Sequence, residues 1–366
     1  MKVIIATCFE SNEERAGFIL DACKSRGYKA EVLTSDFSHI RKEKRNSFPE
    51  GFEAIATQPY NKNLSLARMI SHAKFAKSLF AYIEKKDADL IWLMAPANSL
   101  IKEAKTYKRK HPEKKLIIDI IDMWPESLPL NISKDLLPFK MWKDIRRNNI
   151  DCCDFLVTEC DLYQDILHKE YSGKMKTIRW ARNSKAIRTK TVVSDDNLSL
   201  VYIGSINNII DAERIAKIIS GIDMPVLLHV VGEGENTNHF LETLKKVCEV
   251  KYHGPIRDED KKAAIFDQCH AGINIYREGL YIGLTVKCID YFQHGLPIIN
   301  NIKGDTWNLV EEYNAGINVS NDLKVDAKKL IEIRNNNKTV YDLFNDNLTK
   351  DTFVVKCLDV INEVAK

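Results

Sequence analysis

The chain has 366 residues, of which 45% are hydrophobic and 29% are charged, as in ordinary globular proteins. At roughly 100–200 residues per domain, this length predicts two domains. Lysine and arginine together number 54 against 51 aspartates and glutamates, a net charge of +3. This balance argues against a protein held to nucleic acid by bulk charge, so we expect no nucleic-acid partner.

The sequence also bears on the compartment. No apolar run reaches the ~20 residues that a membrane-spanning helix needs. The start, Met1–Thr7, has one lysine and a short apolar run, which does not resemble a secretory signal. The nine cysteines are scattered and form no CxxC pair. We therefore expect a cytoplasmic protein without structural zinc.

The first half of the chain alternates short apolar runs with longer segments of helical spacing, which predicts a parallel sheet covered on both faces. The predicted helices include Glu13–Arg26 and Leu66–Lys85. The predicted strands are Val3–Thr7, Ala30–Leu33, Leu90–Met94, Leu116–Ile121, Phe155–Thr158 and Thr177–Trp180.

Residues 184–198 are polar with little apolar periodicity, and they are the best linker candidate. After them the alternation restarts, with helices such as Asp211–Ile219 and Asp258–Asp267 and a final helix, Phe353–Ala365. The strands predicted here are Leu198–Ile203, Val226–Val231, Val250–His253, Ala271–Tyr276 and Pro297–Asn300.

These patterns predict an α/β protein with two Rossmann-like, doubly wound domains that face a cleft. The first domain covers residues 1–183 and the second covers 199–350, with the linker 184–198 between them. The final helix, 351–366, is expected to cross back to the first domain. Folds of this kind bind ligands at the carboxyl ends of their strands.

The stretch 283–300 reads GLTVKCIDYFQHGLPIIN and follows a predicted strand. Gly283 lets the backbone approach a ligand closely, and Thr285 is a favourable N-cap for the helix that follows. Free N–H groups at a helix start attract anions. Lys287 in the first turn suits a bound anion, and Asp290, one turn later on the same face, suits a ribose diol. The alternative is a surface Lys–Asp pair on an ordinary crossover.

This run resembles the donor-site signature of GT-B glycosyltransferases related to family 4, Gly-Leu-Pro-x-Lys-x-x-Glu-Tyr-x-x-x-Gly-x-Pro. The resemblance implies that amides around Gly283–Thr285 and the Lys287 ammonium hold the donor diphosphate. Asp290 takes the place of the ribose-binding glutamate. Many members carry an earlier glutamate, which is Ile282 here. The residues that match as they stand are Gly283, Leu284, Lys287, Tyr291, Gly295 and Pro297.

Three shorter strings agree with this resemblance, although each alone predicts only a turn. They resemble the glycine turn that opens the second domain, the Gly-x-Gly turn near the nucleotide, and the loop that reads the base. Residues 205–209 hold no cation where many relatives carry Arg and Lys. The phosphate charge then rests on Lys287, helix amides and Arg277. The donor-binding residues implied by these strings are Gly204, Ser205, Gly232, Gly234 and His253.

A second signature, DIIDMWPES, runs from Asp119 to Ser127 at the end of a predicted strand. It resembles the Asp-x-x-Asp-x-Trp-Pro-Glu-Ser string of bacterial polysaccharide glycosyltransferases in the same superfamily. Carboxylates there suit sugar hydroxyls or an acceptor proton. The resemblance makes Asp122 a candidate catalytic residue and Asp119 a candidate acceptor ligand. The alternative is that Asp119 bonds local backbone and Trp124 only packs.

The run Tyr60–Asn63 with the helix after it also resembles this subgroup. Arg68 and His72 are four residues apart on one face of that helix. The resemblance makes both of them candidates for binding the acceptor. The alternative for His72 is a structural histidine in the core.

The segment Phe139–Arg147 mixes bulky apolar residues with four cations and one acid, and Arg41–Arg45 is a second basic cluster. Such segments suit an anionic membrane surface. A core helix with a solvated face is the alternative. Because polysaccharide enzymes of this type commonly use a lipid-diphosphate acceptor, we expect peripheral binding at the inner face of the plasma membrane.

The sequence thus predicts a glycosyltransferase of hexosyltransferase type that acts in cell-surface polysaccharide biosynthesis. Its expected partners are a nucleotide-sugar donor and a glycan or polyprenyl-diphosphate-linked acceptor. By resemblance the reaction retains the anomeric configuration and needs no metal or other cofactor. Two alternatives remain: a GT-B nucleotide-sugar epimerase, and a non-catalytic nucleotide- or sugar-binding module.

Overall fold

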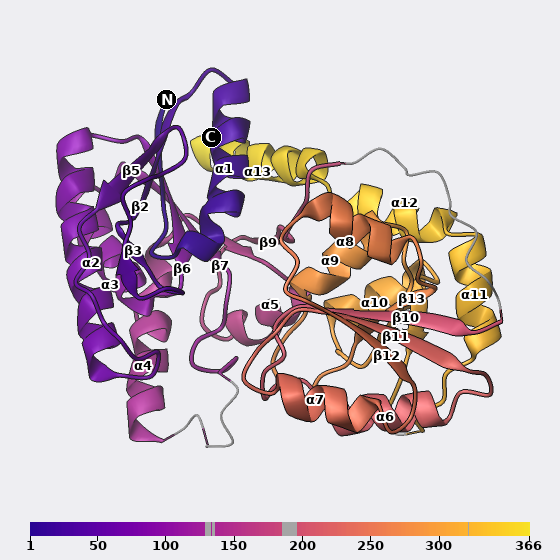
Figure 1. Cartoon of the computed structure of the whole chain (residues 1–366). Coiled ribbons are helices and arrows are strands. Elements are labelled where there is room, and N and C mark those ends of the chain that lie inside the picture. Colours follow the sequence, from indigo (N-terminus) through magenta and orange to yellow (C-terminus); the bar gives the residue numbers. More distant parts are fainter. Residues whose placement is uncertain (129–132, 134–135, 185–195, 321) are drawn as a thin grey trace. The chain divides into compact units, whose positions relative to one another are not determined.

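The computed structural model describes residues 1–128, 133, 136–184, 196–320 and 322–366. The chain divides into two compact units (Figure 1). Unit 1 consists of Met1–Arg179 and Asp351–Lys366, and unit 2 is Trp180–Lys350. The last helix, α13 (Lys350–Ala365), therefore packs with unit 1. The predicted linker 184–198 lies largely outside the described residues.

Unit 1 is built on a seven-stranded parallel sheet in the order β5-β2-β1-β6-β7-β8-β9. The strand order reverses beside β1, which lies between β2 and β6. A short antiparallel pair, β3 (Phe37–Ser38) and β4 (Glu43–Lys44), lies outside this sheet. The strands of the sheet are β1 (Lys2–Ala6), β2 (Lys29–Ser35), β5 (Phe52–Ile55), β6 (Leu90–Ala95), β7 (Lys115–Ile120), β8 (Phe155–Thr158) and β9 (Met175–Thr177).

Helices cover both faces of this sheet (Figure 1). On one side α13 packs against α1, where the ring centroids of Phe18 and Phe353 are 5.7 Å apart. The longest helix, α2, begins where Ser65 Oγ accepts a hydrogen bond from the Arg68 amide at 3.2 Å. The helices of unit 1 besides α13 are α1 (Glu13–Ser25), α2 (Leu66–Lys86), α3 (Asn98–Lys110), α4 (Leu137–Arg147) and α5 (Asp161–Leu167).

Unit 2 repeats this plan with a six-stranded parallel sheet in the order β12-β11-β10-β13-β14-β15. Here the strand order reverses between β10 and β13. Helices again cover both faces. The strands are β10 (Leu198–Ile203), β11 (Val226–Val231), β12 (Glu249–Gly254), β13 (Ala271–Asn274), β14 (Ile298–Asn300) and β15 (Gly316–Asn318). The helices are α6 (Ala212–Ser220), α7 (Thr237–Leu244), α8 (Glu259–Phe266), α9 (Val286–Gln293), α10 (Asp305–Glu312), α11 (Ala327–Asn335) and α12 (Lys338–Asn347).

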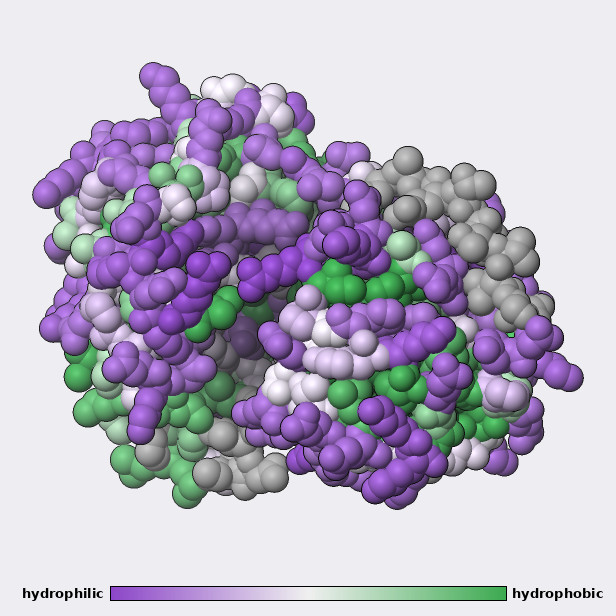
Figure 2. Space-filling model, in the orientation of Figure 1, coloured by the Kyte–Doolittle hydropathy of each residue, from purple (hydrophilic) through white to green (hydrophobic). Residues whose placement is uncertain are grey.

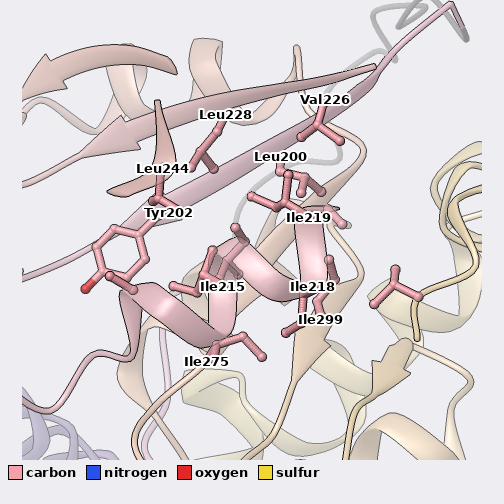
Figure 3. Packing of buried hydrophobic residues seen from close by; sticks show 14 of the residues in the cluster. Leu200, Tyr202, Ile215, Ile218, Ile219, Val226, Leu228, Leu244, Ile275 and Ile299 are labelled. Atoms are coloured by element: carbon pink, nitrogen blue, oxygen red, sulfur yellow. The ribbon is translucent and has the colours of Figure 1, made fainter. Parts of the chain in front are cut away.

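The central strand β10 shows why its sequence is apolar throughout. Successive side chains of a strand point to opposite faces of the sheet. Leu200 and Tyr202 pack into the core beneath α6, together with Ile215 (Figure 3). Val201 and Ile203 belong to the core on the other face, which α8 and α9 cover. The prediction of two doubly wound α/β domains is therefore confirmed.

Candidate functional site

Lys287 lies at the point where the strand order of unit 2 reverses. It is in the first turn of α9, and only 9% of the residue is exposed. Its Nζ lies 4.1 Å from the ring centroid of Tyr202 on β10 and 4.6 Å from that of Tyr276, just after β13. Within the part of the chain that the structure describes, this ammonium has no hydrogen-bond partner. Open α/β sheets bind ligands at this position.

Among the described residues, no side chain forms an ion pair with Lys287. Burial lowers the pKa of Lys287 to about 7, because a buried ammonium loses its hydration. Two aromatic rings attract the cation but do not neutralise it. An anion bound against Nζ would restore the charged form, so the geometry favours a ligand that carries negative charge.

The glycines of unit 2 bring three loops close together beside this lysine. Gly204 and Gly232 have φ values of +120° and +131°, which L side chains rarely adopt. A Cβ on Gly232 would lie 2.0 Å from the Gly204 oxygen, and one on Gly234 would lie 2.2 Å from the Ile206 oxygen. A Cβ on Gly204 would point at Lys287 Cε, 3.8 Å away. At the end of β10, Lys287 therefore lies next to glycine backbone without side chains.

The start of α9 differs from the sequence prediction in one detail. Thr285 is the N-cap residue, but its hydroxyl does not cap the helix. It donates to Asn274 Oδ1 on β13 at 2.8 Å instead. Gly283 is held through its oxygen, which accepts from Thr306 N and Oγ1, both at 2.8 Å. The first turn of α9 thus has no side-chain cap, which suits an external anion.

The other predicted donor residues lie at different positions in unit 2. Leu284 is buried, whereas Ser205 and Arg277 are exposed. The exposed His253 stacks on the buried His229, with ring centroids 5.2 Å apart. Asp290 Oδ1 accepts from Arg182 Nε at 3.0 Å, an ion pair that sequence reasoning did not include.

Tyr202 and Tyr276 were also missed, although they form the immediate surroundings of Lys287. The Tyr202 hydroxyl donates to the Ser205 oxygen at 2.7 Å, which fixes the ring under the ammonium. The sequence did contain a signal for both residues. Each is a tyrosine near the end of one of the two strands, β10 and β13, between which the strand order reverses.

In unit 1 the structure corrects the role expected for Asp119. This carboxylate lies within β7 and is fully buried. Arg15 binds both of its oxygens at 2.9 Å, and Trp92 Nε1 donates to Oδ2 at 3.1 Å. Asp119 therefore stabilises the core of unit 1, and we no longer regard it as an acceptor ligand.

The remaining candidates of unit 1 lie beyond the carboxyl ends of its strands. Asp122 follows β7, is partly exposed, and accepts a hydrogen bond from Ser127 Oγ. Burial raises the pKa of Asp122 above its usual value. Arg68 is 4% exposed and His72 3%. Burial and the nearby Arg68 lower the pKa of His72 to about 3, so this imidazole is neutral.

No protein-family profile and no curated protein sequence matches the chain, but solved structures do. Anabaena HepE (Alr3699) with UDP aligns with a TM-score of 0.66 and 12% identity, over 99% of this chain and 100% of HepE. The lipopolysaccharide outer core galactosyltransferase WaaB gives the same values. A glycosyltransferase from Rickettsia africae aligns with a TM-score of 0.65 and 12% identity, over 100% of this chain and 98% of its own. The chain has the GT-B fold. At this identity the likeness concerns the fold, so the activity has to be argued from the site.

Proposed function

We propose that the chain is a glycosyltransferase that moves a sugar from a nucleotide-sugar donor to a glycan or lipid-linked acceptor in cell-surface polysaccharide biosynthesis. The observation that carries the proposal is Lys287, a buried ammonium at the strand reversal of unit 2 whose Nζ has no hydrogen-bond partner among the described residues. HepE, which shares the fold, has been solved with UDP and with UDP-glucose. In our proposal unit 2 binds the donor and unit 1 binds the acceptor.

The proposed chemistry is charge stabilisation on the leaving group. As the bond between the anomeric carbon and the diphosphate breaks, negative charge grows on the diphosphate oxygens. Lys287 and the uncapped amides of α9 would stabilise that charge, which is electrostatic catalysis. Asp122 would accept the proton of the acceptor hydroxyl, and its raised pKa makes it a better base. We propose that the transfer retains the anomeric configuration and needs no metal.

A panel of nucleotide sugars tests the proposal. A true donor at 100 times its Kd should stabilise the protein by ~2.7 kcal/mol, visible as a rise in melting temperature. Transfer is then measured with the stabilising donor, with and without EDTA. Sugar interconversion without acceptor would indicate an epimerase, and binding without turnover a binding module. If no nucleotide or nucleotide sugar stabilises the protein, the proposal is wrong.

Replacing Asp290 with asparagine tests the ribose contact. If Asp290 accepts hydrogen bonds from the ribose diol, the neutral amide should weaken the nucleoside diphosphate and the intact donor equally, by ~1–3 kcal/mol. Calorimetric titration with both ligands measures the change. Arg182→Gln is the control, because it removes the ion-pair partner of Asp290 and leaves the carboxylate. Normal binding of the free nucleotide by Asp290→Asn would contradict the assignment.

We also propose that unit 1 docks on an anionic membrane surface. None of the helices in the described residues is long and apolar enough to cross a bilayer. Hydrophobic residues gather over the ends of α2 and α4 (Figure 2). They include Leu66 and Leu137, 72% and 74% exposed, and Met141, 62% exposed. The sequence reasoning counted Arg146 among the surface cations, and the structure corrects this. Its side chain is 1% exposed and pairs with Glu126 and Glu170.

The exposed cations Lys140 and Arg147 are therefore the ones to change. Reversing both to glutamate should release the protein from anionic vesicles, since each cation near the surface contributes ~1 kcal/mol. Vesicle flotation at low and physiological salt measures this. The matched control reverses the exposed Lys245 and Lys246 of unit 2, with the same change in net charge. Equal flotation of wild-type protein with neutral and anionic lipid, or none with either, would refute membrane docking.

A further inference from the structure

Arg68 differs from the other buried arginines in the described residues. Each of those has acceptors for its guanidinium: Asp119 for Arg15, Glu126 and Glu170 for Arg146, and backbone oxygens of Phe266, Cys269, His294 and Gly295 for Arg334. Arg68 is 4% exposed, and its Nη1 donates to the Asn63 oxygen at 2.8 Å. Its Nη2 is fully buried and has no partner among the described residues. A buried charge without a counter-ion is costly unless a ligand supplies one.

The surroundings of Arg68 are aromatic and carry little compensating charge. The guanidinium carbon lies 4.3 Å from the ring centroid of Trp124, 5.7 Å from that of Phe9 and 5.9 Å from that of Tyr60. Lys42 brings a second cation, with its Nζ 4.9 Å from the Tyr60 ring centroid. Stacking on rings leaves the donor edge of the guanidinium available for a planar or tetrahedral oxyanion.

The titratable groups around Arg68 do not neutralise it. Burial lowers the pKa of His39 to about 4 and that of His72 to about 3, so both rings are neutral. Glu10 is engaged elsewhere, because its oxygens accept from Ser38 Oγ and from two backbone amides. Asp122 is near enough to raise the pKa of Arg68, but the structure shows no ion pair between the two side chains within the described residues.

The location of Arg68 is that expected of a ligand site. It lies in the first turn of α2, and Phe9 and Trp124 follow β1 and β7, respectively. The strand order of unit 1 reverses beside β1. Lys287 of unit 2 is likewise in the first turn of a helix, α9, which there follows β13. Each unit therefore has a buried cation with an unpaired nitrogen beyond the carboxyl ends of its own strands.

We propose that Arg68 is the centre of an anion site in unit 1 that binds a phosphate group carried by an apolar chain. A guanidinium binds phosphate oxygens through two parallel N–H donors, and Lys42 adds a point charge. The apolar chain is inferred from the exposed side chains around Arg68 on the same helix end, which would cover hydrocarbon. These are Leu64, Leu66, Met69 and Ile70, with 55%, 72%, 38% and 41% exposed, respectively. Assigning this phosphate to the acceptor rests on the proposed function; the anion site does not.

Tryptophan fluorescence provides a direct test, because Trp124 stacks on the Arg68 guanidinium. The full chain carrying Lys287→Ala, which disables the anion site of unit 2, is titrated with inorganic pyrophosphate and with geranyl diphosphate. We expect a saturable change with both ligands and at least tenfold tighter binding of geranyl diphosphate. Arg68→Gln should weaken both at least tenfold, and Arg68→Lys less. In Trp124→Phe the signal should disappear.

Three outcomes would overturn the proposal. A Lys287→Ala protein that shows no response would mean that unit 1 has no anion site. An unchanged response in Arg68→Gln, or in Arg68→Lys where the glutamine variant does not fold, would place the anion elsewhere. Equal affinity for the two diphosphates would exclude the apolar chain. Failure of the proposed function would appear separately, as absence of transfer from any nucleotide sugar.

Discussion

Replacing Lys287 with alanine is expected to lower kcat/KM for the nucleotide-sugar donor by about 30- to 1,000-fold, equivalent to ~2–4 kcal/mol of transition-state stabilisation. The reason is that Nζ is the buried cation of the unit 2 site, and its removal leaves the departing diphosphate matched only by helix amides. Initial rates over a range of donor concentrations measure the effect. Lys217→Ala, an exposed lysine on α6, is the control and should be neutral. A change of less than threefold for Lys287→Ala would remove this residue from the mechanism.

The same lysine predicts a pH dependence of donor binding. The pKa of Lys287 in the free protein is lowered to about 7, so its ammonium is fully present below that pH and is lost above it. A bound diphosphate favours the charged form, so donor affinity should fall as the pH rises above about 7, by up to about tenfold per unit for one linked proton. Lys287→Arg keeps its charge and should show a flat profile between pH 7 and 9. Identical slopes for the two proteins in calorimetric titrations would contradict the linkage.

The fold could be predicted from the sequence where all or nearly all residues of a strand are buried. Phe155–Thr158, Leu198–Ile203 and Val226–Val231 were predicted with the bounds that the structure shows. The prediction of strands was less accurate where the apolar residues in the sequence do not coincide with the residues that form the strand. The predicted strand Thr177–Trp180 corresponds to β9 (Met175–Thr177), and the short strands β5 and β15 were missed. Strands of three or four residues with mixed polarity give too little periodicity to detect.

The candidate site shows a similar division. Lys287 could be found because its helix start, glycines and following turn are local in sequence. Its surroundings could not, because Tyr202 and Tyr276 come from strands far apart in the chain and meet only through the order of the sheet. The ion pair between Asp290 and Arg182 is equally non-local. Residue types in a motif suggest chemistry, but only the tertiary structure shows which groups surround them.

Asp119 and Asp122 illustrate the same point within one motif. Both belong to the string DIIDMWPES, which made Asp122 a candidate catalytic residue and Asp119 a candidate acceptor ligand. The register of β7 separates them: Asp119 pairs with Met94 and Val157 inside the sheet, whereas Asp122 lies beyond the end of the strand. The partner Arg15 is 104 residues away from Asp119 in sequence, so nothing near the motif indicated a buried ion pair.

Replacing Asp119 with alanine should therefore destabilise unit 1 by ~3–5 kcal/mol, because removing one partner leaves the Arg15 guanidinium buried and unpaired. Urea denaturation measures the loss. Since a protein of two units need not unfold in one step, the probe should report on unit 1. Trp92, whose indole N–H donates to Asp119 Oδ2 at 3.1 Å, is such a probe in a background where the other four of the five tryptophans are replaced by phenylalanine.

Two further variants distinguish a structural role of Asp119 from a catalytic one. Arg15→Ala alone should be as damaging, but the double variant should lose much less than the sum, because it leaves no uncompensated charge in the core. Asp122→Asn keeps the shape of a partly exposed side chain, so it should lower the transfer rate with little loss of stability. If Asp119→Ala instead folds normally and loses only activity, the buried pair is not what stabilises unit 1. Asp119 would then have to reach the acceptor through a conformation in which β7 has opened.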